Sequence, residues 1–274
     1  MSAYTCRKLY GLFLLGLVIT LGSCARIGTL ERQDRDSFNK IIQQYQSPDW
    51  ETRRSALSAL SLYSFPPSDP YFPILEKTLI LALDDPHPML RIEALKCLQK
   101  MPGMKVRARI AEIASYDPSP NIRWSAIRTL AGYKDPSFVQ VFIIGLSSDD
   151  WLIREESIRG LLLIDDVSIV QLHLNYILTA LEDRELSVRL AALESLSLRE
   201  PRLYNAIAGM LNTDISDKNT LLKALLRAIQ GYELDPETKR RVTDLLLHPN
   251  VDIRVLALRA IKAGEEAAAT QKKD

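Results

Sequence analysis

The sequence predicts an all-α protein, a right-handed α-solenoid of about seven helix-turn-helix repeats. Three observations predict it. A short motif recurs along the chain at intervals of roughly 30 to 40 residues, which is the period of repeat architectures. The apolar residues of each copy follow the period of an α-helix. Hydrophobic residues make up 47% of the 274 residues, which is enough for a continuous core.

The repeated motif is recognised by an arginine that precedes a small residue and a buried aliphatic residue. Six copies align without gaps on Arg53, Arg91, Arg123, Arg154, Arg189 and Arg254. A degenerate copy places Leu222 in the arginine position. Positions −1, +3, +4 and +7 from the arginine lie on one face of a helix and form its buried stripe. In the third copy this puts Ala126 in the core and Ser125 at the surface.

A second apolar stretch with helical periodicity precedes each of these helices. The seven stretches are 38–45, 71–83, 106–114, 138–146, 170–181, 203–211 and 239–247. Short breaks such as Asp85-Pro86 and Asp117-Pro118 separate the two helices, because aspartate caps the next helix and proline stops the previous one. Each unit is therefore a helix, a turn and a helix.

This pattern resembles the HEAT repeat family, including its PBS-lyase HEAT-like members, over residues 37–263. The resemblance implies stacked helix pairs that cover one another's apolar faces as one elongated, monomeric superhelix. It also implies a structural role for the repeat arginines, which bond an aspartate and backbone carbonyls of neighbouring turns. Residues 264–274 are expected to be a flexible tail. Cys97 and the tryptophans at position −3, Trp50 and Trp151, are interpreted as packing residues.

The N-terminus has the features of a cleavable export signal. Arg7 and Lys8 precede an uncharged apolar run at 9–21, which is shorter than the ~20 residues that a spanning helix needs. The tetrapeptide Leu21-Gly22-Ser23-Cys24 that follows resembles the lipobox of bacterial lipoproteins. The resemblance implies cleavage after residue 23, acylation of Cys24, and a tether at 24–36. The lipid would hold the protein on a membrane facing the periplasm, and Ala25 favours the outer membrane.

Charge and motif content argue against several functions. The chain carries 35 Lys and Arg against 34 Asp and Glu, and removal of the signal makes it slightly negative, which argues against a nucleic-acid partner. His87, His173 and His248 stand alone, so they predict no metal site. No nucleophile elbow, P-loop or dinucleotide fingerprint is present. We therefore expect no catalytic residues and no cofactor.

The candidate partner-binding residues occupy positions +1 and +5 of the second helices, which point away from the buried stripe. They are Ile92, Lys96, Trp124, Arg128 and Arg159. An aromatic residue among cations has the composition of a binding hot spot. The sequence thus predicts a membrane-tethered scaffold or adaptor that binds one or more envelope proteins or peptides. The alternative is an accessory subunit or lyase-like enzyme with a pocket between repeats.

Overall fold

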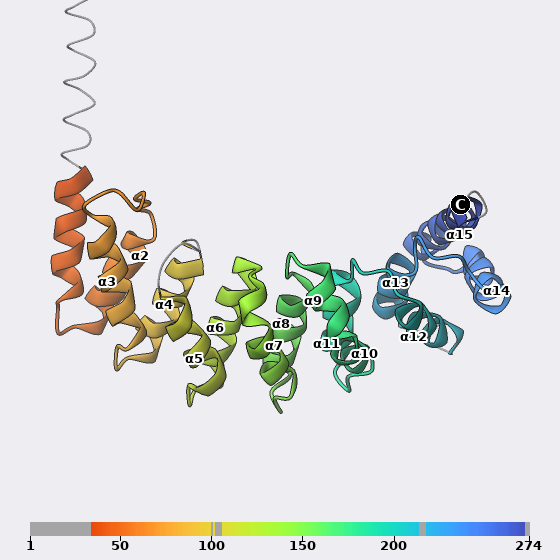
Figure 1. Ribbon diagram of the computed structural model, residues 1–274, viewed down its shortest axis with the longest axis horizontal. Helices are drawn as coiled ribbons and strands as arrows, with labels where there is room; N and C mark the ends of the chain where they lie inside the picture. The colour runs from red at the N-terminus through yellow and green to blue at the C-terminus, as the bar shows by residue number, and fades with distance from the viewer. Residues whose placement is uncertain (1–33, 100, 102–105, 214–217, 272–274) are drawn as a thin grey trace, which may run out of the picture. The chain divides into compact units, whose positions relative to one another are not determined.

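The computed structural model describes residues 34–99, 101, 106–213 and 218–271, and these residues form helices and turns without a strand (Figure 1). The prediction of an all-α solenoid is confirmed. The predicted signal, the lipobox and Cys24 lie outside the described residues. The chain divides into two compact units, one ending at Cys97 and one beginning at Leu98.

The first unit contains two helix pairs. Residues 34–45 are helical. The other helices are α2 (Trp50–Leu60), α3 (Phe72–Leu83) and α4 (Pro88–Gln99). Phe38 is fully buried, and its ring lies 5.1 to 5.4 Å from those of Tyr63, Phe65 and Tyr71. This aromatic cluster fills the space under the connection between α2 and α3, and edge-to-face ring contacts stabilise it.

The second unit contains the remaining repeats. Its first part comprises α5 (Arg107–Tyr116), α6 (Pro120–Tyr133), α7 (Val139–Leu146), α8 (Trp151–Leu162), α9 (Val167–Leu172), α10 (Leu174–Leu181) and α11 (Leu186–Ser195). Its second part comprises α12 (Pro201–Asn212), α13 (Asn219–Ala228), α14 (Pro236–Asp244) and α15 (Val251–Gln271). The second helices of successive repeats, α6, α8, α11, α13 and α15, pack against one another in chain order.

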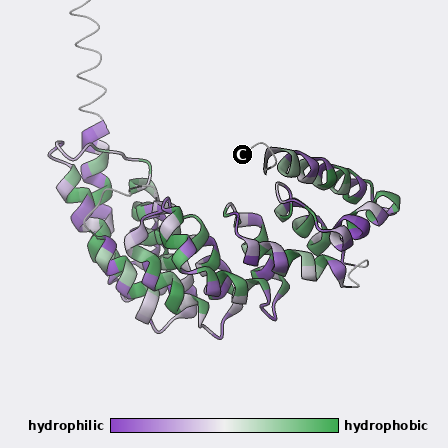
Figure 2. Ribbon diagram, turned by 45° about the vertical axis from the view of Figure 1, so that its right-hand side comes forward, coloured by the Kyte–Doolittle hydropathy of each residue, from purple (hydrophilic) through white to green (hydrophobic). Residues whose placement is uncertain are grey.

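The core is formed by the predicted stripe of each second helix. In α6, for example, Ile122, Ala126, Ile127 and Leu130 are at most 1% exposed. Hydropathy colouring shows that the same helices carry both polar and apolar residues, as amphipathic helices do (Figure 2). Close packing also needs small residues at position +6. A Cβ on Gly160 would lie 2.4 Å from the Phe142 ring, so only glycine permits this contact between α7 and α8.

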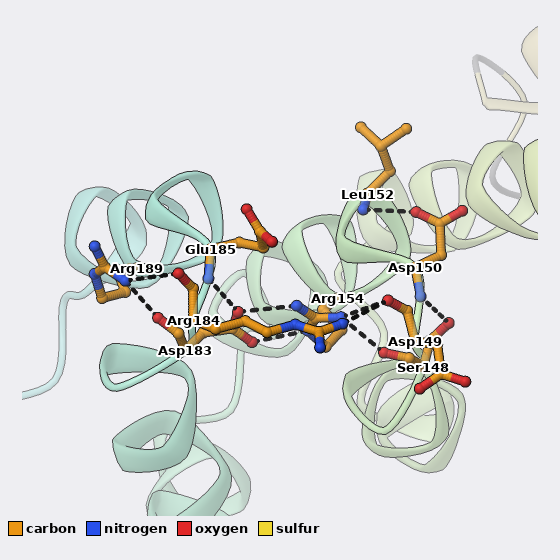
Figure 3. A network of polar contacts seen from close by, with 9 residues as sticks. All are labelled: Ser148, Asp149, Asp150, Leu152, Arg154, Asp183, Arg184, Glu185 and Arg189. Atoms are coloured by element: carbon orange, nitrogen blue, oxygen red, sulfur yellow. Dashed lines mark hydrogen bonds and ion pairs between the residues drawn. The ribbon is translucent and has the colours of Figure 1, made fainter.

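All six repeat arginines make one recurring contact. Each guanidinium donates from Nη1 to the backbone carbonyls five and six residues earlier, across the turn that opens its helix. Arg154, on α8, also donates from Nε and Nη2 to both oxygens of Asp183, at 2.8 and 2.9 Å, in the turn before α11 (Figure 3). Arg53 pairs with Asp85 in the same way. Such forked pairs join the opening turns of successive repeats and stabilise their stacking.

Three boundaries and positions differ from the sequence-based expectations. Helical structure already includes residues 34–36, which were assigned to the tether. Helix α15 continues to Gln271, and Gly264 is buried, so residues 264–271 are helical instead of a flexible tail. Ser125 is only 7% exposed, so its assignment to the surface was wrong. It lies at position +2, and the third repeat is covered on this side because α6 packs against both α5 and α8.

Candidate partner-binding surface

The predicted site residues fall in both compact units. Ile92 and Lys96 belong to α4 in the first unit, whereas Trp124 and Arg128 lie on α6 and Arg159 on α8 in the second. The structure brings the last three together, because α6 and α8 pack side by side. We call Trp124, Arg128, Glu155, Glu156 and Arg159 the α6–α8 surface.

Arg128 and Trp124 form the cationic and aromatic part of this surface. One helical turn separates them, and the guanidinium carbon of Arg128 lies 5.4 Å from the centroid of the Trp124 ring. This is the distance of a cation–π contact. Arg128 is exposed and Trp124 half-buried, and among the described residues Arg128 forms no ion pair. The arginine is therefore held over the indole while its hydrogen-bond donors stay available to a partner.

The α8 part of the surface is acidic as well as basic. Arg159 donates to Glu155 Oε1 at 3.1 Å, one turn earlier on the same helix. Glu156 is half-buried, and burial raises the pKa of its carboxyl above its ordinary value of 4.5, although Arg128 and Arg159 partly oppose this rise. Sequence reasoning missed Glu156 because it considered only positions +1 and +5. The sequence signal that could have found it is a charged residue at position +2. The structure shows that this position is half-buried in this repeat.

The first unit contributes a groove of about 550 Å³ between α2 and α4. Its lining residues are Trp50, Glu51, Arg54, Ser55, Ser58, Glu93 and Lys96. Lys96 lies 3.4 Å from Glu93, and Trp50 stacks on His87 with ring centroids 4.1 Å apart. Sequence reasoning missed this groove, although Arg54 and Ser58 occupy the +1 and +5 positions of the first repeat and could have indicated it.

These contacts change the predicted character of the site. The sequence predicted a row of three cations, but Lys96 and Arg159 each pair with a glutamate on their own helix. Exposed pairs of this kind contribute little to stability, and they reduce the net positive charge that a partner meets. Arg128 is the cation of the row without a carboxylate neighbour within ion-pair distance in the described part of the chain. We therefore treat Trp124 and Arg128 as the centre of the surface.

The remaining chemistry-bearing side chains take part in local structure. His173 Nδ1 lies 2.8 Å from the Ile169 carbonyl, and His248 Nδ1 accepts from the Asn250 N–H. Cys97 is fully buried, and its Sγ lies 3.3 Å from the Leu57 carbonyl. Trp151 is 41% exposed, which is more than a packing residue requires. No cluster of three metal-ligating side chains occurs within the described ranges.

Comparison with known proteins indicates a repeat fold. A model of HEAT repeats matches residues 75–162. The X-ray structure of YibA from Escherichia coli is similar at a TM-score of 0.60, with 17% identity over 83% of this chain and 82% of that chain. An engineered protein is similar at a TM-score of 0.53, with 15% identity over 84% of this chain and 71% of that chain. No curated protein matches the sequence.

At these identities the likeness extends to the fold alone. The match to HEAT repeats covers α4 to α8 and so includes every candidate residue of the α6–α8 surface. In the described part of the chain, no helix is both long and apolar enough to cross a membrane. The second helices of the second unit pack on one another and expose partly polar surfaces. Repeat proteins commonly bind other molecules by surfaces of this kind.

Proposed function

We propose that this protein is a lipid-anchored scaffold of the bacterial cell envelope that holds a protein or peptide on the second helices of its repeats. The repeat fold supports the scaffold part, because stacked helix pairs present an extended surface whose composition can vary without loss of the core. The lipobox-like sequence ending at Cys24 supports the anchor, and Ala25 favours the outer membrane. Two or more acyl chains are enough for stable membrane attachment.

The single observation that carries the binding proposal is the Trp124–Arg128 pair. An indole held against an exposed arginine combines apolar area with hydrogen-bond donors, and both residue types are enriched at hot spots. The partner that this pair suits is an extended segment that offers a carboxylate to Arg128 and an apolar side chain to Trp124. Glu156 lies close enough to Arg128 to feel its charge, and Glu155 pairs with Arg159 on the same helix, so a segment with a basic residue next to its acid suits the whole surface better than a purely acidic one.

The anchor is tested by replacing Cys24 with alanine in the full chain. Because the thiol is the acylation site and marks the cleavage position, Cys24→Ala should abolish labelling by a radioactive fatty acid and leave the precursor uncleaved. Cys97→Ala serves as the control, since it removes a cysteine of the body of the chain. Normal labelling of the Cys24 variant would contradict the anchor proposal.

The binding surface is tested by recovering partners from detergent-solubilised envelope with the wild-type protein and with Trp124→Ala. Loss of the indole should weaken binding by about 2 kcal/mol, the cost of a typical hot spot. Arg128→Glu should mainly slow association, because charge acts on the encounter. Trp151→Ala is the matched control, since Trp151 is an exposed indole at the start of α8, outside the proposed surface.

Circular dichroism of each variant shows whether the helices remain intact, which matters for Trp124 because its ring is half-buried. A Trp124→Ala variant that folds normally and keeps its affinity for the recovered partner would exclude the α6–α8 surface. Equal losses in Trp124→Ala and Trp151→Ala would also exclude it, because the loss would then follow general destabilisation.

A further inference from the structure

Helix α15 exposes a row of aliphatic side chains. Val251, Val255 and Leu258 are 59%, 43% and 46% exposed and are spaced by four and three residues, so they lie along one side of the helix. We call these three residues the α15 row. Leu247, 89% exposed, lies just before its N-terminal end. Clustered aliphatic residues on one exposed helix side mark an interaction surface more often than scattered ones do.

The other repeats show which residue of the α15 row is unusual. Val251 and Val255 occupy positions −3 and +1, which are exposed or half-buried in the other repeats as well. Leu258 occupies position +4, and the six earlier residues at this position are between 0% and 3% exposed. They are Leu57, Leu95, Ile127, Ile158, Leu193 and Leu226. In the second unit, α6, α8, α11 and α13 each pack against the second helix of the following repeat. Leu258 therefore lies on the side that a following repeat covers, and no described element covers it.

We propose that a second copy of this chain covers the α15 row, through antiparallel packing of the two α15 helices about a two-fold axis. In this register Val251 of each copy meets Leu258 of the other, and the two Val255 side chains meet near the axis. An isologous contact of this kind closes on itself and gives a dimer. The inference rests on the repeat geometry and is independent of the proposed anchor and of the α6–α8 surface.

Charges at the two ends of the row suit this arrangement. Asp252 is exposed beside Val251, and Arg259 is exposed beside Leu258 on the same side of α15. Asp252 pairs with Lys223, but its side chain stays 70% exposed. Antiparallel packing brings Arg259 of each copy toward Asp252 of the other, so opposite charges meet twice. A parallel pair would instead place like charges together.

The first repeat explains why two copies would join by these ends and not head to tail. In a head-to-tail contact α15 would pack against α2, the second helix of the first repeat, whose exposed residues are all charged or polar, namely Glu51, Arg54, Ser55 and Ser58. Packing the α15 row against them would bury polar groups without hydrogen-bond partners. The sequence-based expectation of a monomer took no account of this difference between the first and last repeats.

Disulfide cross-linking of the full-length chain in a cell extract, with an added oxidant so that the result does not depend on export, tests the proposal. Val255→Cys places a thiol near the axis, where two facing helices bring their Cβ atoms within disulfide range. We expect a disulfide-linked dimer, identified by co-expressing two differently tagged copies. Leu172→Cys is the matched control, because Leu172 is 80% exposed on α9, away from α15, and its thiol should form little dimer.

A second substitution separates specific pairing from chance collision. Adding Leu258→Glu to Val255→Cys buries a charge in the interface and should lower the cross-linked fraction about tenfold or more. Adding Leu172→Glu should leave it unchanged. The proposal is overturned if Val255→Cys gives no dimer, if it gives no more dimer than Leu172→Cys, or if the new thiol links to a different protein.

Discussion

Helices α8 and α13 occupy the same place in two repeats but use opposite chemistry at the repeat position. In α8 this position holds Arg154, which is 7% exposed, bonds the carbonyls of Ser148 and Asp149, and forms a forked pair with Asp183. In α13 it holds Leu222, which is fully buried. Both helices nevertheless pack between the second helices of their neighbours.

The difference shows that stacking does not depend on the arginine in every copy. A buried ion pair that is replaced by well-packed apolar residues is often neutral or stabilising, whereas removal of one partner alone is costly. The α8 junction therefore depends on both of its charged partners being present. The α13 junction depends on the apolar volume of one side chain. Three substitution experiments can break or sharpen this comparison.

The largest effect is expected from Arg154→Leu. It leaves Asp183 partly buried without its guanidinium and removes the two hydrogen bonds from Arg154 Nη1 to the Ser148 and Asp149 carbonyls. Breaking one side of such a pair costs about 3–5 kcal/mol of unfolding free energy. Urea denaturation followed by far-ultraviolet circular dichroism measures it. The double variant Arg154→Leu with Asp183→Leu should recover most of the loss, and a double variant as unstable as the single one would contradict the comparison.

A smaller effect is expected from Leu222→Ala. Because Leu222 is fully buried, its truncation removes apolar contacts and leaves a cavity, at a cost of about 3 kcal/mol. Leu222→Met is the control, since it conserves volume and should cost less than about 1.5 kcal/mol. Equal destabilisation by the two variants, measured by the same denaturation, would mean that the α13 junction does not depend on apolar volume.

The smallest effect is a difference in pH dependence. Burial alone would raise the pKa of Asp183, but hydrogen bonds from Arg154 and from the Glu185 N–H outweigh it and hold this pKa below 3.8. A pKa that is lower in the folded state stabilises the protein above the unfolded value, and this contribution disappears as the pH falls through the folded value. Below about pH 4 the wild type should therefore lose stability more steeply than the Arg154→Leu, Asp183→Leu variant. Parallel pH profiles would show that Asp183 makes no such contribution.

The repeat pattern was enough to predict the helices and most of the core. The apolar stretch 138–146, for example, corresponds to Pro136–Phe138 followed by α7, and the stretch 203–211 corresponds to α12 with one or two residues more at each end. Such predictions succeed because burial in a solenoid is set by neighbours close in sequence, so helical periodicity indicates which side of each helix is covered.

The candidate surface was predictable only in part. Position in the repeat indicated that Trp124 and Arg128 lie outside the buried stripe, and it placed Glu155 one turn before Arg159, but it did not show that Lys96 and Arg159 each pair with a glutamate. Position in the repeat also assigned Ser125 wrongly to the surface. The periodicity of a single helix does not show how far a neighbouring repeat covers each side chain. Side-chain pairing depends on rotamers and on distances across turns, which periodicity does not contain.

The sequence by itself thus determined the repeat, the amphipathic helices and the arginine positions, since each follows from spacing along one chain. Only the tertiary structure decided which arginines meet a carboxylate of the next repeat, that Phe142 is the ring packed against Gly160, and that Leu258 stays exposed where six equivalent residues are buried. These features depend on what lies across the contact between helices. The amount of covering surface is a property of the stack, and a single repeat cannot show it.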